Sequence, residues 1–309
     1  MPMRALITGI KGFVGQYLLE ELKKNNIGTF GISRKEEIKG NLYKGDILDL
    51  EGITNIIKSI RPDVVFHLAG FTSVKDSWEK PDEAMRLNKG GTENLYKAIE
   101  RIDINIKVIL ASSAEVYGNP AKLPISETDP VHPVNPYSKS KLAQEEVANN
   151  NPKIKTIICR SFHHTGPRQL PIFAIPSFAK QVAMAEAGLQ NEILVGNLDA
   201  QRDFTDVRDV VRAYRMLAQS DNWGQTYNIC SGKTWSIKQV LDILLQYSKK
   251  NIIITADPSK IRPNDIPVLQ GNNAKIKNDT EWELKIPFST TIKDTLEYWR
   301  GIITYGDHA

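Results

Sequence analysis

Three side chains of this sequence could carry out redox chemistry on a carbonyl or an alcohol. Tyr137 and Lys141 form a Tyr-x-x-x-Lys pair, and Ser113 precedes them in the segment Ser112-Ser113-Ala114-Glu115. Positions i and i+4 share one face of a helix, so the phenol and the ammonium can point into one cleft, where Ser113 would bind the same substrate oxygen. A neighbouring cation favours phenolate, so Lys141 is expected to bring the pKa of Tyr137 closer to neutrality and prepare it for proton transfer. The pair alone would also fit an ordinary amphipathic helix with a surface tyrosine, so the argument depends on the segments around it.

A glycine-rich turn lies near the N-terminus, where 4–8 predicts a buried strand and 13–24 an amphipathic helix. The spacing Gly-x-x-Gly-x-x-Gly permits a tight turn, a close approach of backbone to a pyrophosphate, and close packing of helix on strand. The helix adds its N-terminal N–H groups as phosphate donors. The turn therefore predicts a dinucleotide site. The residues expected to contact the dinucleotide here are Gly9, Gly12, Phe13, Val14 and Gly15.

The end of the second predicted strand, 29–33, indicates which dinucleotide binds. An Asp or Glu there would accept from the ribose 2′-hydroxyl of NAD, but the sequence has Ser33-Arg34-Lys35. A hydroxyl and two cations suit a 2′-phosphate, which predicts NADP(H), although the cations could also be solvated loop charges. Asp46 and Ile47 are expected to flank the adenine.

The remaining segments alternate short apolar runs at 64–68, 107–112 and 156–160 with helical patterns at 81–102 and 137–149. This alternation predicts an α/β fold with a Rossmann-type, doubly wound parallel sheet and helices on both faces. Ligands of such sheets bind at the carboxyl ends of the strands, which adds Leu68, Ala69 and Gly70 to the expected cofactor site. The proline-rich loop 119–136 is expected to form a lip of the cleft.

A second, substrate-binding region is expected after the parallel strands. The division we predict is 1–165 for NADP binding, with a return to the sheet over 205–232, and 166–204 plus 233–309 for a smaller, discontinuous substrate domain. In the substrate domain we expect a helix near 176–188 and a tail over 252–300 interrupted by prolines. The segments 207–219 and 227–229 are expected to return to the sheet of the NADP-binding domain.

Composition narrows the function classes. The chain has 309 residues, 41% of them hydrophobic and 25% charged, with a net charge of +4 spread along its length. No basic block or aromatic-interleaved stripe suggests nucleic acid or a membrane surface, and no apolar run approaches the length of a membrane helix. Cys159 and Cys230 lack metal-ligand spacing and are expected to be core residues in a reducing compartment. A cytoplasmic enzyme of small, anionic molecules without a metal site is predicted.

Six motifs occur in order along essentially the whole chain. They are Thr8-Gly9-x-x-Gly12-Phe13-Val14-Gly15, His67-Leu68-Ala69, Ser112-Ser113-x-Glu115-Val116-Tyr117-Gly118, Pro136-Tyr137-x-x-x-Lys141, Gly196-Asn197-Leu198-Asp199-Ala200-x-Arg202-Asp203-Phe204 and Arg262-Pro263. Taken together, these motifs resemble the extended short-chain dehydrogenase/reductase family that modifies nucleotide-diphosphate sugars. The last two look most like the GDP-mannose branch, which contains a 4,6-dehydratase and a 4-keto-6-deoxy-mannose reductase, and segments 73–78 and 203–209 favour the reductase.

The resemblance implies further roles. Lys141 would also hold the nicotinamide ribose, Arg202 and Arg262 the substrate diphosphate or its ribose, and Asp265 a ribose hydroxyl. His163 departs from the pattern, since relatives usually carry Asn there, and it could be structural instead. The residues expected to bind the substrate are Ser73, Lys75, His163, Asn197, Arg202, Arg262 and Asp265.

The choice between dehydration and reduction depends on which side chains can donate or accept a proton. A 4,6-dehydratase needs an acid and a base beyond Tyr137; Glu115 could be the base, but Ala114 can neither donate nor accept a proton. Reduction needs only a hydride from NADPH and a proton from Tyr137. We therefore expect an NADPH-dependent reductase of the C4 keto group of a GDP-4-keto-6-deoxy-hexose, yielding GDP-D-rhamnose or its C4 epimer, and a homodimer. A GDP-mannose 4,6-dehydratase, a nucleotide-sugar 4-epimerase and an inactive NADP-sensing protein remain alternatives.

Overall fold

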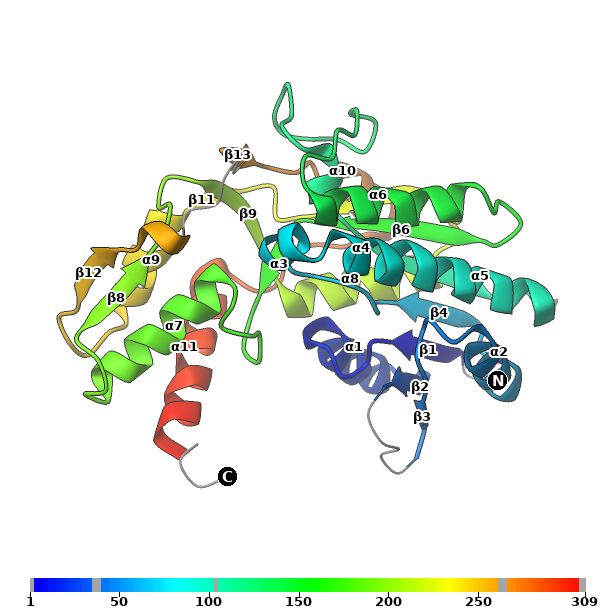
Figure 1. Ribbon diagram of the computed structural model, residues 1–309, viewed down its shortest axis with the longest axis horizontal. Helices are drawn as coiled ribbons and strands as arrows, with labels where there is room; N and C mark the ends of the chain where they lie inside the picture. Colours follow the sequence, from blue (N-terminus) through cyan, green and yellow to red (C-terminus); the bar gives the residue numbers. More distant parts are fainter. Residues whose placement is uncertain (1–2, 35–39, 103–104, 261–265, 306–309) are drawn as a thin grey trace.

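The structure, a computed structural model, describes residues 3–34, 40–102, 105–260 and 266–305 (Figure 1). Two groups of elements make up the molecule. A large parallel sheet with helices on both faces lies on the right of Figure 1, and a smaller group built around α7, α9 and α11 lies on the left. The predicted α/β class is confirmed.

The large sheet has seven strands in the order β10-β6-β5-β4-β1-β2-β3, and all their pairings are parallel. The strand order changes direction between β1 and β4: β2 and β3 follow on the side of β1, and β5, β6 and β10 follow on the side of β4. The carboxyl ends of β1 and β4 therefore form the crevice where such folds bind ligands. The strands are β1 (Arg4–Thr8), β2 (Gly28–Ser33), β3 (Leu42–Lys44), β4 (Val64–His67), β5 (Lys107–Ser113), β6 (Thr156–Ser161) and β10 (Thr226–Ile229).

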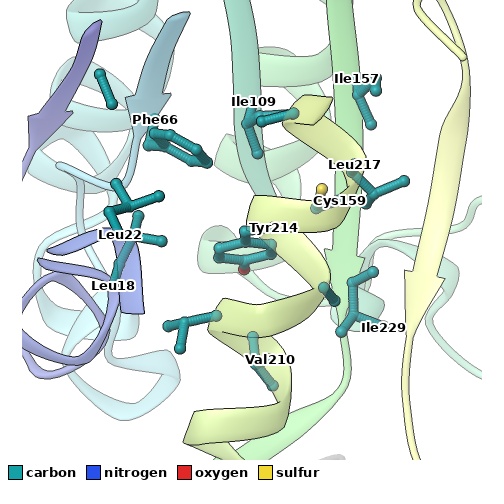
Figure 2. Packing of buried hydrophobic residues seen from close by; sticks show 14 of the residues in the cluster. Leu18, Leu22, Phe66, Ile109, Ile157, Cys159, Val210, Tyr214, Leu217 and Ile229 are labelled. Atoms are coloured by element: carbon teal, nitrogen blue, oxygen red, sulfur yellow. The ribbon is translucent and has the colours of Figure 1, made fainter. Parts of the chain in front are cut away.

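Helices bury both faces of this sheet. On one face α1 (Phe13–Lys24) and α8 (Val207–Gln219) pack their apolar sides against the strands, and Figure 2 shows Leu18, Tyr214 and Leu217 of these helices turned toward Phe66 and Cys159. On the other face lie α2 (Leu50–Ile60), α5 (Gly91–Ile102) and α6 (Pro136–Asn149). Both cysteines, Cys159 and Cys230, are buried and free, as core residues should be.

Two predicted elements differ from the structure. The helix expected over 81–102 is interrupted, because a π-helical turn, Arg86–Gly90, joins α4 (Pro81–Met85) to α5. Residues 207–219 do not rejoin the sheet as a strand: they form α8, and only β10 adds to the sheet beside β6. The strong amphipathic period of 207–219 is helical, and its apolar side faces the strands.

The second group contains two small sheets. β9 (Gln201–Asp206) pairs with β7 (His163–Thr165), β11 (Thr234–Ser236) and β13 (Val268–Leu269), while β8 (Glu192–Val195) pairs with β12 (Ile253–Ala256). Three helices, α7 (Ala174–Glu186), α9 (Ile237–Gln246) and α11 (Phe288–Tyr305), share one apolar core.

The expected tail over 252–300 is therefore more ordered than its prolines suggested. It holds β12, the short helix η3 (Pro258–Lys260), β13, α10 (Ala274–Thr280) and most of α11. Pro287 lies immediately before α11, where a proline is compatible with the start of a helix. Among the described residues, no helix is both long and apolar enough to span a bilayer.

Candidate active site

A cavity of about 1590 Å³ separates the two groups of elements. Its floor is the carboxyl edge of β1, β4 and β5, and its far wall comes from β7, β9 and the start of α7. Most of the expected site residues line it. They are Gly9, Gly12, Phe13, Val14, Gly15, Ser33, Arg34, Asp46, Ile47, Leu68, Ala69, Gly70, Ser73, Lys75, Ser113, Glu115, Tyr137, His163, Asn197 and Arg202.

The glycine turn leaves its backbone open to this cavity. Gly9 has φ of +74°, and a Cβ there would meet the backbone N of Ala69 at 2.9 Å. A Cβ on Gly15 would lie 2.3 Å from the carbonyl oxygen of Gly9, so α1 could not pack this close to the turn. Gly12 is the N-cap of α1, which has no side-chain cap and no acid in its first turn. Free N–H groups at an uncapped helix start suit a pyrophosphate, so these residues fit a dinucleotide.

The end of β2 presents the groups expected for a 2′-phosphate. Ser33 is buried at the last position of the strand, and the next residue, Arg34, is exposed and lines the cavity. Beside the end of β2, where the backbone N of Gly45 donates to the carbonyl oxygen of Ser33 at 3.0 Å, the Asp46 carboxylate accepts from the backbone N of Leu48 at 3.0 Å and so braces its own loop. Lys35 lies outside the described residues.

A buried histidine, which the sequence argument did not single out as functional, orders the loop after β4. Thr8 Oγ1 lies 2.8 Å from His67 Nδ1 and accepts from the backbone N of both Leu68 and Ala69 at 3.1 Å. His67 Nε2 lies 3.0 Å from the hydroxyl of Thr92. Burial, followed by the nearby Lys141 charge, lowers the pKa of His67 to about 3, so this ring is neutral and acts as a structural linker.

The helix α6 brings the predicted catalytic pair to the end of β5. Asn135 caps α6 in a reciprocal capping box with Ser138, and Pro136 occupies its first turn. Tyr137 therefore lies at the first turn of α6, where its side chain hydrogen-bonds Ser113. The Ser113 hydroxyl also accepts from the backbone N of Glu115 at 3.2 Å. Ser113 and Tyr137 thus face the same point of the cavity, as the motif predicted.

Lys141 lies elsewhere than expected. Its ammonium donates to the carbonyl oxygen of Ala111 at 2.7 Å and to Gln144 Oε1 at 2.8 Å, and Lys141 is absent from the described residues that line the cavity. The sequence argument is therefore wrong about the pKa of Tyr137 in this structure. Burial raises that pKa to about 12; the hydrogen bond from Ser113 lowers it and the Glu115 charge raises it, and Tyr137 is a phenol at neutral pH.

Glu115 and Ala114 form the rest of the catalytic floor. Glu115 is buried in the short helix η2 (Ala114–Tyr117), and its Oε2 accepts from Asn135 Nδ2 at 3.0 Å. Ala114 lies between Ser113 and Glu115 on the cavity lining and brings only a methyl group. The carboxylate of Glu115 is therefore close enough to influence Tyr137, and the position beside Ser113 offers no proton.

The far wall is made of side chains on and around β9. Arg202 is buried there and donates to the carbonyl oxygen of Gln201 at 2.9 Å, and the His163 ring meets Phe204 edge-on at 5.8 Å. Asn197 Oδ1 accepts from the backbone N of Asp199 at 3.0 Å. Ser73 Oγ caps the short helix α3 (Val74–Glu79), and Lys75 lines the cavity from that helix. Arg262 and Asp265 lie outside the described residues.

A buried carboxylate holds β9 in place behind this wall. Asp203 accepts from the backbone N of Ser231 at 2.7 Å, of Gly232 at 2.9 Å and of Gly271 at 3.2 Å. Three segments distant in sequence therefore meet at one side chain, directly next to Arg202. The Arg-Asp-Phe run was recognisable in the sequence, but the role of its Asp as an anchor depends on these long-range contacts.

His164 and Arg168 also line the cavity, and neither was among the expected contacts. The His164 ring stacks on Phe13 at 6.2 Å, and its Nδ1 lies 3.0 Å from the carbonyl oxygen of Phe162. Arg168 lies 3.9 Å from the centre of the Tyr17 ring and forms an ion pair with Glu20 at 2.6 Å, which ties the cavity rim to α1. Sequence spacing gave no signal for either contact.

Comparison with known proteins places this geometry in a family. A family model described as GDP-mannose 4,6 dehydratase matches residues 6–295. The GDP-6-deoxy-D-mannose reductase of Pseudomonas aeruginosa is 32% identical over 305 residues, which cover 97% of this chain and 98% of that one. The chain therefore belongs to the GDP-mannose 4,6-dehydratase family of extended short-chain dehydrogenases/reductases.

Solved structures agree with this assignment. The structure of RMD from Pseudomonas aeruginosa complexed with NADPH superposes with a TM-score of 0.87 at 31% identity, covering 97% of this chain and 99% of that one. The UDP-glucose 4-epimerase of Thermus thermophilus, in complex with NAD, has the same TM-score of 0.87 at 26% identity, covering 97% of this chain and 99% of that one. The protein is an NAD(P)-dependent oxidoreductase that acts on a nucleotide sugar, and the family resemblance drawn from the motifs is confirmed.

Proposed function

We propose that this protein reduces the C4 keto group of a GDP-4-keto-6-deoxy-hexose with NADPH, giving GDP-D-rhamnose or its C4 epimer. The observation that carries the proposal is the lining beside Ser113, where Ala114 brings only a methyl group to the cavity. A 4,6-dehydratase needs an acid and a base beyond Tyr137, and an alanine can neither donate nor accept a proton. Reduction needs only a hydride from NADPH and a proton from Tyr137, a phenol that hydrogen-bonds Ser113.

Each residue of the site has its own role in the reduction. Ser113 and Tyr137 together bind the keto oxygen, and Tyr137 Oη donates its proton to that oxygen as the alcohol forms. When bound, NADPH supplies the hydride for C4. Lys141 rests against Ala111 and Gln144 in this structure, so it must turn toward the cavity to support the phenolate that is left. Arg202 and Asn197 on the far wall hold the nucleotide part of the substrate. Solvent then returns a proton to Tyr137.

The choice of NADP(H) is supported by the end of β2. Arg34 lines the cavity next to Ser33, where a guanidinium can form two hydrogen bonds with a 2′-phosphate. The sequence has no acid at this position to bind the ribose hydroxyls of NAD. The NADPH in the Pseudomonas aeruginosa structure supports the same choice.

Product analysis tests the proposal. Incubation with GDP-4-keto-6-deoxy-mannose and NADPH should consume NADPH in equal amounts with the keto sugar, and NMR should show an axial or equatorial hydroxyl at C4 of the product. A loss of NADPH absorbance that stops once each enzyme molecule has consumed one NADPH would instead favour an NADP-sensing protein.

A GDP-mannose 4,6-dehydratase remains a second candidate because of Glu115. Its carboxylate is near enough to Tyr137 to affect the tyrosine pKa, and it lines the cavity. It could serve as the base at C5, with water as the acid that Ala114 does not provide. Efficient conversion of GDP-mannose and NADP⁺ to the keto sugar, without net use of NADPH, would establish this activity and contradict the reductase.

We also propose a homodimer that pairs through helices including α6, the arrangement that the family resemblance implies. Light scattering on the purified protein would measure its mass. A monomer at micromolar concentration would contradict the pairing without affecting the proposed chemistry.

A further inference from the structure

The buried side of α6 is polar, and one of its residues has no evident structural use. Glu145 pairs with Arg160 at 2.7 Å, and Ser140 donates to the carbonyl oxygen of Tyr137 at 2.7 Å. Gln144 is fully buried as well, yet its amide nitrogen has no hydrogen-bond partner among the described residues. An unsatisfied buried amide N–H is unfavourable, so an apolar side chain of similar size would pack here at lower cost.

The other end of the Gln144 amide contacts the one basic group of the catalytic motif. Its Oε1 accepts from Lys141 Nζ at 2.8 Å, and the carbonyl oxygen of Ala111 accepts from the same nitrogen at 2.7 Å. An ammonium can only donate, so Lys141 determines which way the amide of Gln144 faces. The nitrogen is turned away and left unsatisfied because the oxygen is held by Lys141.

The other titratable groups near Lys141 are neutral or already paired, so the Gln144 amide is one of the main partners of the ammonium. Glu145 lies one helical turn along α6, but Arg160 of β6 and the Ser112 hydroxyl already occupy its carboxylate. His67 of β4 is neutral, and Tyr137 on α6 is a phenol. Two neutral oxygens are therefore the direct partners of the ammonium.

We propose that Gln144 is a positioning residue for Lys141, and that its carbonyl oxygen keeps the lysine side chain charged and aligned between β5 and α6 until the dinucleotide binds. Lys141 then turns from this resting place toward the cavity. The inference depends on the NAD(P)-dependent class of the protein and is independent of which sugar it reduces.

The predicted consequence is a change in the pH dependence of cofactor binding. Burial lowers the pKa of Lys141 to about 8, while the Glu145 charge raises it. Affinity for NADPH should therefore weaken as the pH rises through about 8, because the neutral amine binds the dinucleotide less well. His67 and Tyr137 do not titrate in this range, so the transition reports on Lys141.

Two substitutions should move this transition in opposite directions. Gln144→Leu removes an acceptor from a buried ammonium and should shift it about one unit toward lower pH, whereas Gln144→Glu supplies a carboxylate and should shift it about one unit upward. Fluorescence titration with NADPH from about pH 6 to about pH 10, without any sugar, would measure both. If Gln144→Leu fails to fold, the Gln144→Glu shift decides the question alone.

A matched control and a double variant separate positioning from packing. Gln181→Leu removes a glutamine that bonds the backbone of Leu194 from α7, and it should leave the transition unchanged. In the background of Lys141→Met the transition should be absent, and adding Gln144→Leu should change NADPH affinity less than about twofold. Equal pH dependence in the native protein and both Gln144 variants, or shifts in the same direction, would overturn the proposal.

Discussion

The two walls of the cavity present different groups to a ligand, one mainly backbone and the other mainly side chains. The wall beside β1 and α1 exposes its backbone to the cavity, because Gly9, Gly12 and Gly15 have no side chains and α1 starts without a side-chain cap. The wall beside β9 consists of side chains, chiefly Arg202, Asn197, His163 and Phe204. A backbone cradle suits the pyrophosphate that all dinucleotides share, and side chains can be exchanged to suit one sugar nucleotide. Cofactor binding should therefore tolerate little change near the turn, and substrate choice should depend on the far wall.

The largest effect should come from the floor between the walls, at Tyr137. Tyr137→Phe preserves the ring and removes the proton donor, so kcat should fall by about 10²-fold or more. NADPH affinity should change only modestly, because the phenol faces the substrate oxygen. Steady-state kinetics with a keto sugar and equilibrium titration with NADPH would test both statements. Near-normal turnover would remove Tyr137 from the mechanism.

A smaller effect, confined to the cofactor, is expected at Arg34. Arg34→Ala should weaken NADPH binding by about 1.5–3 kcal/mol, the range for a hydrogen bond to a charged group, and leave NADH binding nearly unchanged. Calorimetry with the two dinucleotides would make the comparison. Equal losses for both would show that Arg34 does not read the 2′-phosphate.

On the far wall, Arg202→Lys should affect the other ligand. The substitution keeps the charge and loses the planar fork, so the KM for the nucleotide sugar should rise about 10-fold while NADPH affinity stays the same. Measuring both constants on one preparation sharpens the contrast between the walls. A matching loss of NADPH affinity would mean that the two walls are not independent.

The smallest effect concerns a glycine far from the cradle. Gly301 lies inside α11 with open space where a Cβ would stand, so Gly301→Ala should stabilise the protein by about 0.5–1 kcal/mol. Gly15→Ala has the opposite setting, since its Cβ would meet backbone at 2.3 Å, and should destabilise by about 1–3 kcal/mol. Urea unfolding measures both. A destabilised Gly301→Ala would show that α11 is constrained by contacts beyond the described ones.

Several parts of the fold could be predicted because their signals are local. The turn from Gly9 to Gly15 has one strand before it and one helix after it, so its position in a doubly wound sheet follows directly. The helix from Pro136 carries its own cap and proline. The π-helical turn at 86–90 was not predicted, because it has no distinctive local pattern. The helix α11 was not predicted either, although Ile292, Leu296 and Trp299 recur at helical spacing, because the prolines of 252–300 were interpreted as breakers.

The amino-acid sequence by itself determined the family, the dinucleotide cradle and the identities of Ser113, Tyr137 and Lys141, since these depend on residue types at short, fixed spacings. Tertiary structure alone decided that Lys141 rests against Ala111 and Gln144, and that burial raises the pKa of Tyr137 to about 12. The charge state of a group depends on the solvent it loses and the partners it gains, and segments distant in the chain supply both.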